Sequence, residues 1–486
     1  MPHPLPRYLL AALMLGLATT VAAQTPGSTP EACASPTSDD ASDNRPDAVA
    51  IAERNRELKL LGIAQMKPGV GAFAIGKPCN ANYDEALANP YPDLPDALTT
   101  RAGAKVTTAA QWWDTRRPEI AEQMQSQVYG FVPKDVPPVS WRVARSARDT
   151  IGGVAVVVKD LVGHVDNSAW PAINVDIRAQ LVTPADAQGR AVPVIVMNGS
   201  RVEPIPLNPP ASLPQVVSYY SLLGVNNLQQ ILSRGWGYAA LDNTTAQPDS
   251  LPNGDGIDGG IIGLANRGKP RGVDQWGAVR AWAWADSRLV DYLVTDKDVD
   301  AKRIGIFGHS RYGKAALVAM AYDPRFAIGY ISAAGAGGSA LFRRNYGETL
   351  ANLTSPGEFY WFAGNLMQYA AVGHSPDELP VDSHELLAMC APRPVFLSGG
   401  ILMTDPDNIP GDAWQDTRGT FLAAVAASPV YALLGADGLG TDTMPKPLTL
   451  IDHGNLAFRQ HTGGHTPSPN WPYFLQFAQK SFGAKE

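Results

Sequence analysis

Residues 303–320 read RIGIFGHSRYGKAALVAM and predict a strand, a tight turn and a helix in direct succession. Ile304–Phe307 is a short apolar run, the turn that follows is rich in small residues, and Ala315–Met320 is typical of a helix. A serine held in such a turn stands above the sheet, where the first N–H groups of the helix can stabilise a developing oxyanion. Ser310 is therefore the candidate nucleophile, although the second glycine comes one residue later than in the G-x-S-x-G pattern.

Short apolar runs alternate with helical stretches on both sides of this segment. Such runs are typical of parallel strands buried on both faces. We therefore predict an α/β fold with a doubly wound, mostly parallel central sheet and flanking helices. The expected strands are 192–197, 238–241, 304–307, 328–332, 395–398 and 448–452, with 153–160 and an antiparallel, half-exposed strand at 173–181 before them. The expected helices are 109–129, 214–234, 275–294, 313–321, 383–389, 418–434 and 468–482.

The N-terminal segment has the pattern of a secretory signal peptide. Arg7 precedes an apolar stretch too short to span a bilayer, and Val21–Ala23 suits signal peptidase. We expect residues 1–23 to be a signal peptide, residues 24–48 a flexible tether, and residues 49–486 a single catalytic domain with an N-terminal extension. The expected location is the periplasm or the exterior of the cell, with no membrane contact after cleavage.

Composition excludes several classes of protein. The 486 residues include 39 Lys+Arg and 46 Asp+Glu, a net charge of −7, which argues against a protein that binds nucleic acid by neutralising phosphates. With 45% hydrophobic residues, the chain is not globally disordered. Cys33 and Cys79 could pair in an oxidising compartment, whereas Cys390 is expected to be a small buried residue. These three cysteines lack C-x-x-C spacing, so no metal site is expected.

A serine nucleophile needs a general base and an acid that orients it. In doubly wound hydrolases these follow in the order Ser, acid, His. His453, His461 and His465 all come after the last expected strand, and His465, which follows Gly463 and Gly464 before the final helix, is the preferred base. The acid should lie in the loop after residues 395–398, and its spacing does not choose among Asp405, Asp407, Asp412 and Asp416.

With GHSRYGK at 308–314, the chain resembles the glucuronoyl esterases, whose nucleophile motif reads G-x-S-R-x-G-K. Other matching motifs run in order from about residue 80 to the C-terminus, among them Asn82–Ala86, Arg116–Ile120, Gly335–Gly338, Tyr346–Thr349, Leu379–His384, Ala391–Pro394 and Asp412–Asp416. The resemblance implies an α/β-hydrolase fold without metal or other cofactor. It also implies hydrolysis of esters between the 4-O-methyl-glucuronoyl side chains of xylan and lignin alcohols. The expected partner is glucuronoxylan or another lignin–carbohydrate ester, bound by a monomer.

The same resemblance assigns roles to individual residues. Ser310 would be the nucleophile and His465 the base, while Arg311 would help hold the oxyanion. Lys314, Glu348 and Trp414 match residues that contact the sugar, and Glu358 competes with Glu348 for its place. For Lys314 the alternative is a solvated surface lysine.

One position departs from the family pattern. Many members carry the triad acid shortly after the nucleophile, where this chain has Ala333. A bacterial subgroup carries it instead in a later D-x-W-x-D stretch, whose first aspartate matches Asp412, so the expected triad is Ser310–Asp412–His465 with Asp416 and Asp405 as alternatives. Two other functions stay open: another carbohydrate ester hydrolase, such as an acetyl xylan esterase, and a weakly active carbohydrate-binding relative.

Overall fold

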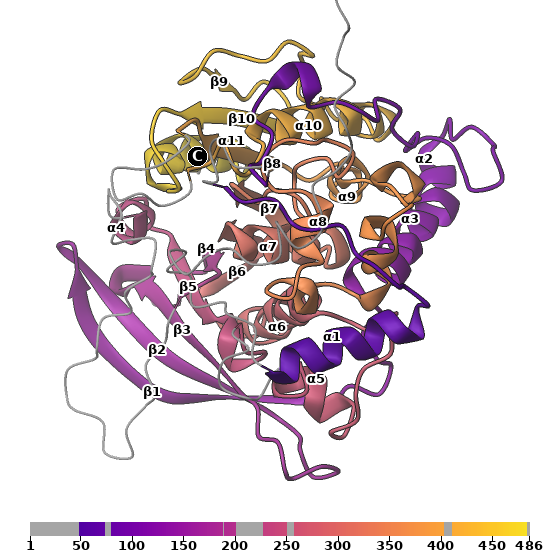
Figure 1. Ribbon diagram of the computed structural model, residues 1–486. Helices are drawn as coiled ribbons and strands as arrows, with labels where there is room; N and C mark the ends of the chain where they lie inside the picture. The colour runs from indigo at the N-terminus through magenta and orange to yellow at the C-terminus, as the bar shows by residue number, and fades with distance from the viewer. Residues whose placement is uncertain are drawn as a thin grey trace, which may run out of the picture.

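The computed structural model describes residues 48–72, 79–187, 189–200, 227–249, 257–402 and 411–483. Within these ranges the strands form one sheet in the order β1-β2-β3-β5-β4-β6-β7-β8-β10-β9 (Figure 1). The strands from β5 to β10 in this order are parallel, whereas β1, β2, β3 and β9 pair antiparallel with their neighbours. Their bounds are β1 (Val139–Ile151), β2 (Val154–Val165), β3 (Asp176–Pro184), β4 (Val192–Met197), β5 (Gly237–Asp242), β6 (Val299–His309), β7 (Phe326–Ser332), β8 (Val395–Gly400), β9 (Leu450–Ile451) and β10 (Leu456–His461).

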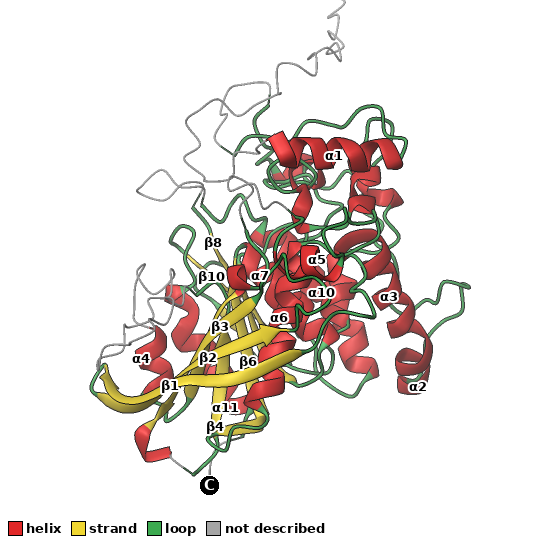
Figure 2. Cartoon of the chain, turned by 90° about the horizontal axis from the view of Figure 1, so that it is seen from below, coloured by secondary structure: helices red, strands yellow, loops and turns green. Residues whose placement is uncertain are grey.

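Helices cover both faces of this sheet (Figure 2). On one face lie α6 (Ala278–Leu293), α7 (Arg311–Tyr322), α9 (Ser383–Ala388) and α10 (Thr417–Leu433); on the other lie α4 (Asn227–Leu232) and α11 (Trp471–Ser481). Alternate residues of β4 serve the two cores, because successive strand residues point to opposite faces. Val194 and Val196 join the core with α6 and α7, whereas Ile195 and Met197 join the core with α4 and α11.

Further helices surround this three-layer centre. They are α1 (Ala48–Leu60), α2 (Ala109–Gln111), α3 (Arg117–Met124), α5 (Gly260–Ala265) and α8 (Leu350–Leu353), with π turns η3 (Trp112–Arg116) and η4 (Gln125–Tyr129). The 3₁₀ turns are η2 (Glu85–Leu87), η5 (Ala185–Ala187), η7 (Asn243–Thr245), η8 (Phe359–Trp361), η9 (Gly364–Ala370), η10 (Pro376–Glu378) and η11 (Ser468–Asn470). Over the described part of the chain, no helix is both long enough and apolar enough to cross a membrane.

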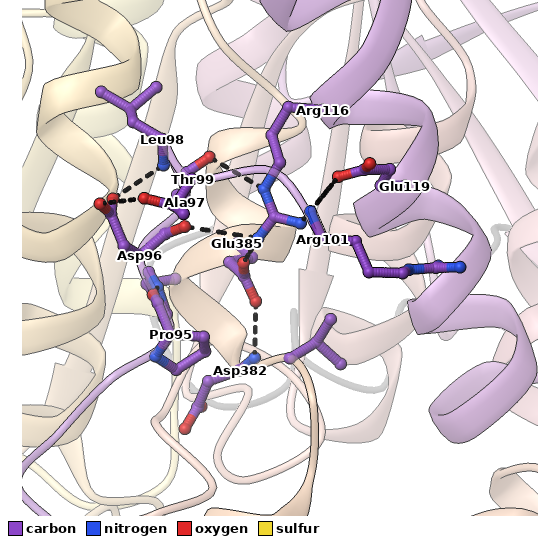
Figure 3. A network of polar contacts seen from close by, with 12 residues as sticks. Pro95, Asp96, Ala97, Leu98, Thr99, Arg101, Arg116, Glu119, Asp382 and Glu385 are labelled. Carbon is purple, nitrogen blue, oxygen red and sulfur yellow. Dashed lines mark hydrogen bonds and ion pairs between the residues drawn. The ribbon is translucent and has the colours of Figure 1, made fainter. Parts of the chain in front are cut away.

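A buried ionic network joins the N-terminal helical stretch to α9 (Figure 3). Arg116 of η3 donates to the carboxylate of Glu385 at 2.5 Å and to the carbonyl of Ala97 at 3.2 Å. The second oxygen of Glu385 accepts the N–H of Asp382, which completes a capping box at the start of α9. Glu385, directly after the motif Leu379–His384, therefore links that motif to Arg116 of the motif Arg116–Ile120.

The predicted fold class is confirmed, and most elements lie where the sequence placed them. Residues 109–129 form a continuous helical stretch through α2, η3, α3 and η4. The expected strand at 173–181 is antiparallel, but as β3 it lies between β2 and β5 and is mostly buried.

Other expectations about the elements were wrong or lie outside the described residues. The edge strand β1 was not predicted. Of the strand expected at 448–452, only the two residues of β9 form a strand, and the last parallel strand is β10, which was not predicted. The proposed signal peptide, the tether up to residue 47, Cys33 and residues 214–226 lie outside the described residues, so those expectations stay predictions. Cys390 is buried with a free thiol, as expected.

The turn between β6 and α7 leaves room only for small residues. A Cβ on Gly308 would lie 2.1 Å from the carbonyl oxygen of Tyr312, which is far closer than van der Waals contact allows. A Cβ on Gly313 would lie 3.0 Å from the carbonyl oxygen of Ser332. The strand and the helix therefore approach each other most closely around Ser310.

Gly308→Ala should destabilise the protein, because the added methyl collides with main-chain atoms that cannot rotate away. We expect a loss of about 1–3 kcal/mol or more in the free energy of unfolding, measured by urea titration. Gly272→Ala is the control, since the nearest atom to its new Cβ would be the carboxylate of Asp274 at 3.1 Å, which can move. Equal losses in the two variants would contradict the steric argument.

Candidate active site

The candidate catalytic residues gather at one edge of the sheet. Ser310 follows β6, Asp412 lies in the segment after β8, and His465 comes shortly after β10. These three strands are parallel, so their carboxyl ends meet at the same edge. In open α/β sheets this is the edge at which ligands bind.

Ser310 occupies a strained main-chain conformation between strand and helix. Its φ of 57° and ψ of −133° lie in a region that L residues rarely adopt. The turn is fixed from both sides, because Ser310 N–H donates to the carbonyl of Ser332 at 3.0 Å and Ser310 C=O accepts from Gly313 N–H at 2.8 Å. Strain of this kind persists where the surrounding structure enforces it, commonly at functional sites. The serine thus stands at the N-terminus of α7, whose first N–H groups are not used inside the helix.

The imidazole of His465 and the carboxylate of Asp412 form a short hydrogen bond. Nδ1 of His465 lies 2.5 Å from Oδ1 of Asp412, whose side chain is fully buried. The other oxygen of Asp412 accepts the main-chain N–H of Gly400, the last residue of β8. A carboxylate anchored in this way holds one ring orientation and leaves Nε2 as the basic nitrogen.

The other aspartates of this loop do not share that geometry. Asp416 forms a buried two-point ion pair with Arg344, at 2.7 and 3.1 Å, and accepts the N–H of Gly419 at 2.9 Å as the N-cap of α10. Asp405 and Asp407 lie outside the described residues. At the earlier family position Ala333 is buried with a φ of 45° and offers no carboxylate. The geometry therefore favours Asp412 over Asp416.

Two further histidines surround this pair, and sequence reasoning assigned neither to it. The ring of His309 lies 4.2 Å from the ring of His465, and its Nδ1 lies 3.0 Å from Oγ of Ser332. Nε2 of His461 lies 3.9 Å from Oδ2 of Asp412, and its Nδ1 accepts the N–H of Gly463 at 2.9 Å. Because His309 precedes Ser310 in the chain, its contact with His465 places the base beside the nucleophile turn.

Burial favours the neutral form of both additional histidines. It lowers the pKa of His309 well below the usual 6.5, and the neighbouring His465 and His461 lower that pKa further. Burial likewise lowers the pKa of His461, although Asp412 opposes this shift. A signal for His309 was available in the sequence, since it sits directly beside the candidate serine.

Arg311 leaves the first turn of α7 toward the loop after β5. Its Nη1 donates to Oδ2 of Asp249 at 3.1 Å, and its guanidinium lies over the ring of Trp361 at 5.0 Å from the ring centre. The side chain keeps 30% of its surface exposed, so it remains accessible at the rim of the site. Sequence reasoning missed Asp249 altogether.

Lys314 leaves the same helix in another direction and is buried. Only 2% of its side chain is exposed, which rules out the solvated-lysine alternative, and its ammonium donates to Glu348 at 2.8 Å and to the carbonyl of Ala336. The N–H of Glu348 donates to the carbonyl of Trp414 at 2.8 Å, so all three predicted sugar-contacting residues are linked. Glu358, the competing acid, lies in another segment as the N-cap of η8.

The arrangement suits acyl transfer by a serine hydroxyl. A strained serine, an imidazole oriented by a carboxylate, and an arginine near the helix N-terminus are the parts that such chemistry needs. Over the residues that the structure describes, no group of three or more His, Cys, Asp or Glu side chains is arranged to hold a metal ion.

Comparisons with known proteins identify the family to which the chain is similar. A family model described as glucuronyl esterase of fungi matches residues 272–435, which include Ser310 and Asp412. A prokaryotic carbohydrate esterase named MZ0003 is 31% identical over 425 residues, covering 83% of this chain and 92% of the relative. A 4-O-methyl-glucuronoyl methylesterase from Schizophyllum commune is 26% identical over 399 residues, covering 80% of this chain and 81% of the relative.

A solved structure extends the likeness to three dimensions. The glucuronoyl esterase from Teredinibacter turnerae superposes with a TM-score of 0.79 at 38% identity, covering 89% of this chain and all of that chain. The chain belongs to the glucuronoyl esterase family of carboxylic ester hydrolases, in its bacterial subgroup.

Proposed function

We propose that this protein hydrolyses esters that join 4-O-methyl-glucuronoyl side chains of xylan to lignin alcohols. The observation that carries the catalytic part is the buried Asp412–His465 pair, held against His309 beside Ser310. The substrate class is supported by the Schizophyllum commune relative, a 4-O-methyl-glucuronoyl methylesterase. It is also supported by the buried Lys314–Glu348 pair one helical turn after the nucleophile.

The proposed reaction has two steps. In the first, Oγ of Ser310 attacks the ester carbonyl while Nε2 of His465 takes its proton, and the tetrahedral intermediate expels the alcohol, which leaves with that proton. In the second, His465 deprotonates water, which attacks the acyl-serine and releases glucuronate and the free serine. Asp412 stabilises the imidazolium in both steps, and Arg311 with the N-terminus of α7 stabilises the oxyanion.

The neutral histidines keep the transferred proton on one ring. Because burial lowers the pKa of His309 and of His461, neither competes with His465 for the proton of Ser310. Their neutrality also spares the imidazolium of His465 from repulsion by a second positive charge a few ångströms away.

The sugar would bind over the residues that link α7 to the segment after β8. A Cβ on Gly335 would lie 2.0 Å from Oε1 of Gln415 and 2.4 Å from Oε2 of Glu348, so these two oxygens lie close together. Oε1 of Gln415 is buried and accepts no hydrogen bond from any described residue. The half-buried Trp414 supplies an apolar face beside them.

The same proposal places the protein outside the cytoplasm, as a monomer. Its support is the signal-peptide pattern at residues 1–23 and the size of the substrate, which is a plant cell-wall polymer.

The first test compares hydrolysis of benzyl glucuronoate with that of 4-nitrophenyl acetate. Ser310→Ala should lower kcat on both substrates by at least about 10³-fold, and Asp412→Asn by about 10²–10⁴-fold, because the imidazole loses its orienting carboxylate. Asp416→Asn is the matched control: it breaks a buried ion pair and should lower the melting temperature while the folded protein keeps kcat within a few-fold.

Three results would count against the proposal. A parent protein that turns over the acetyl ester alone would make it another ester hydrolase. A parent that binds xylan without turnover on either ester would make it a binding protein. A folded Asp416→Asn variant with a larger loss of kcat than Asp412→Asn would move the triad acid.

The sugar contact predicts a substrate-dependent change in KM. We use the double variant Lys314→Met with Glu348→Gln, because it leaves no unpaired buried charge. It should raise KM for benzyl glucuronoate about tenfold or more relative to KM for 4-nitrophenyl acetate, since charged hydrogen bonds to the sugar are lost only with the first substrate. Equal changes for the two esters would remove these residues from sugar binding.

The lowered pKa of His461 predicts a pH dependence of stability. Because its pKa is lower in the folded protein than in the unfolded chain, the unfolded chain binds more proton at this histidine around and below pH 6.5, so this group lowers the free energy of unfolding as pH falls. His461→Gln should therefore lose less stability than the parent between pH 7.5 and pH 5, by at most about 1.4 kcal/mol per pH unit. The difference between the two proteins is the measurement, because buried carboxyls with raised pKa, such as Glu385, act in the opposite direction. Parallel curves would show that His461 titrates normally in the folded state.

A further inference from the structure

One carboxylate collects four side chains beside the nucleophile turn. Oδ2 of Asp249 accepts from Nη1 of Arg311 at 3.1 Å and from the hydroxyl of Tyr312 at 3.2 Å. Oδ1 accepts from Nε1 of Trp361 at 3.2 Å and from the hydroxyl of Tyr360 at 3.4 Å. The main-chain carbonyl of Asp249 accepts from the same Tyr360 hydroxyl at 2.5 Å. This residue therefore ties the first turn of α7 to η8.

The contacts fix Arg311 from two directions at once. Asp249 holds one end of the guanidinium and also holds the indole N–H of Trp361, over whose ring the guanidinium lies at 5.0 Å from the centre. A flexible side chain such as arginine loses much rotamer freedom when it is held in this way. This loss of entropy occurs when the protein folds, before the substrate binds. The guanidinium of Arg311 therefore does not have to reorganise during the reaction.

The charge of Asp249 is more important here than its shape. Burial raises the pKa of Asp249, and Arg311 together with the hydroxyl and indole donors offsets part of that rise by stabilising the carboxylate. The side chain is 16% exposed, and a carboxylate in such a position stabilises a cation far better than an amide of the same size.

We propose that Asp249 is a positioning residue for the oxyanion-holding group: its carboxylate, with Trp361, holds the Arg311 guanidinium where the tetrahedral intermediate forms. This inference rests on the role given to Arg311 in the proposed function. Asp249 itself touches no reacting atom and acts through Arg311.

A double-mutant cycle tests this coupling. Arg311→Ala should lower kcat about 10²–10³-fold, as removal of one oxyanion donor does. Asp249→Asn should lower kcat about 10–100-fold with KM changed less than about threefold, because the loss appears only when the oxyanion forms. The variant with both changes should be no slower than Arg311→Ala within about threefold, since Asp249 has nothing left to position.

Two further variants separate positioning from support of the fold. Asp249→Glu keeps the charge but adds a methylene, so it should keep a higher kcat than Asp249→Asn even if its melting temperature is lower. A structural role predicts the reverse order, with kcat following the melting temperature. Asp286→Asn is the matched control: this carboxyl of α6 is fully buried and bonded to Asn198 at 3.0 Å, and its loss should leave kcat within about twofold.

The cycle is run on benzyl glucuronoate and on 4-nitrophenyl acetate, because the oxyanion forms with both. A parent inactive on the glucuronoate would refute the proposed substrate, and the acetate data would still decide the role of Asp249. The inference would be overturned if the loss of kcat in the double variant equalled the product of the two single losses. An unchanged kcat in Asp249→Asn would also overturn it. An unimpaired Arg311→Ala variant would overturn it together with the oxyanion role of Arg311.

Discussion

The close approach of β6 and α7 at Gly308 is the constraint on which the site depends. Because no Cβ fits against the carbonyl of Tyr312, strand and helix meet with a single residue between them, and that residue is Ser310 at a positive φ. The same turn fixes the directions of the side chains that follow. Arg311 runs toward the loop after β5, and Lys314 runs toward the segments after β7, where Ala336 and Glu348 lie. One steric contact thus places the nucleophile between a group for the oxyanion and a group for the sugar.

The sheet order explains why the triad acid can change place without loss of the triad geometry. β8 lies between β7 and β10 in the sheet, and the base His465 follows β10. The family position now held by Ala333 follows β7, whereas Asp412 belongs to the segment after β8, one strand closer to the base. Asp412 gains the N–H of Gly400 as a rigid anchor at the end of its own strand. At the end of β7, where Ala333 replaces the family's acid, His309 is bonded to Ser332 and packs against the imidazole of His465. The ring of His465 is therefore supported on both sides.

The sequence predicted those features that are local, and it missed those that depend on distant partners. The strand–turn–helix around Ser310 and the apolar strands β4 to β8 are visible because their residues pack on both faces of a sheet. β10 was missed because it carries a buried arginine, Arg459, which lies over the ring of Tyr473 and bonds to Asn470, two residues of the following segment. Asp249 lies 62 residues before Arg311, and nothing in its own neighbourhood marks it. Spacing alone did not separate Asp412 from Asp416; the family resemblance preferred Asp412, and the contacts with His465 and Arg344 now distinguish the two aspartates.

Charge balance connects the two sides of the site to the proposed reaction. Each cation beside Ser310 is paired with a carboxylate, Arg311 with Asp249 and Lys314 with Glu348, and Asp412 adds a third negative charge while His465 is neutral. A uronate ester is uncharged at the acyl group, so these residues do not repel it. The nearby guanidinium of Arg311 stabilises the transient oxyanion. At that stage His465 is protonated, so the charges of these residues sum to zero. When His465 returns its proton, the group again carries a net negative charge next to the glucuronate product. The pairing with Asp249 therefore favours departure of the anionic product as well as a fixed position of Arg311.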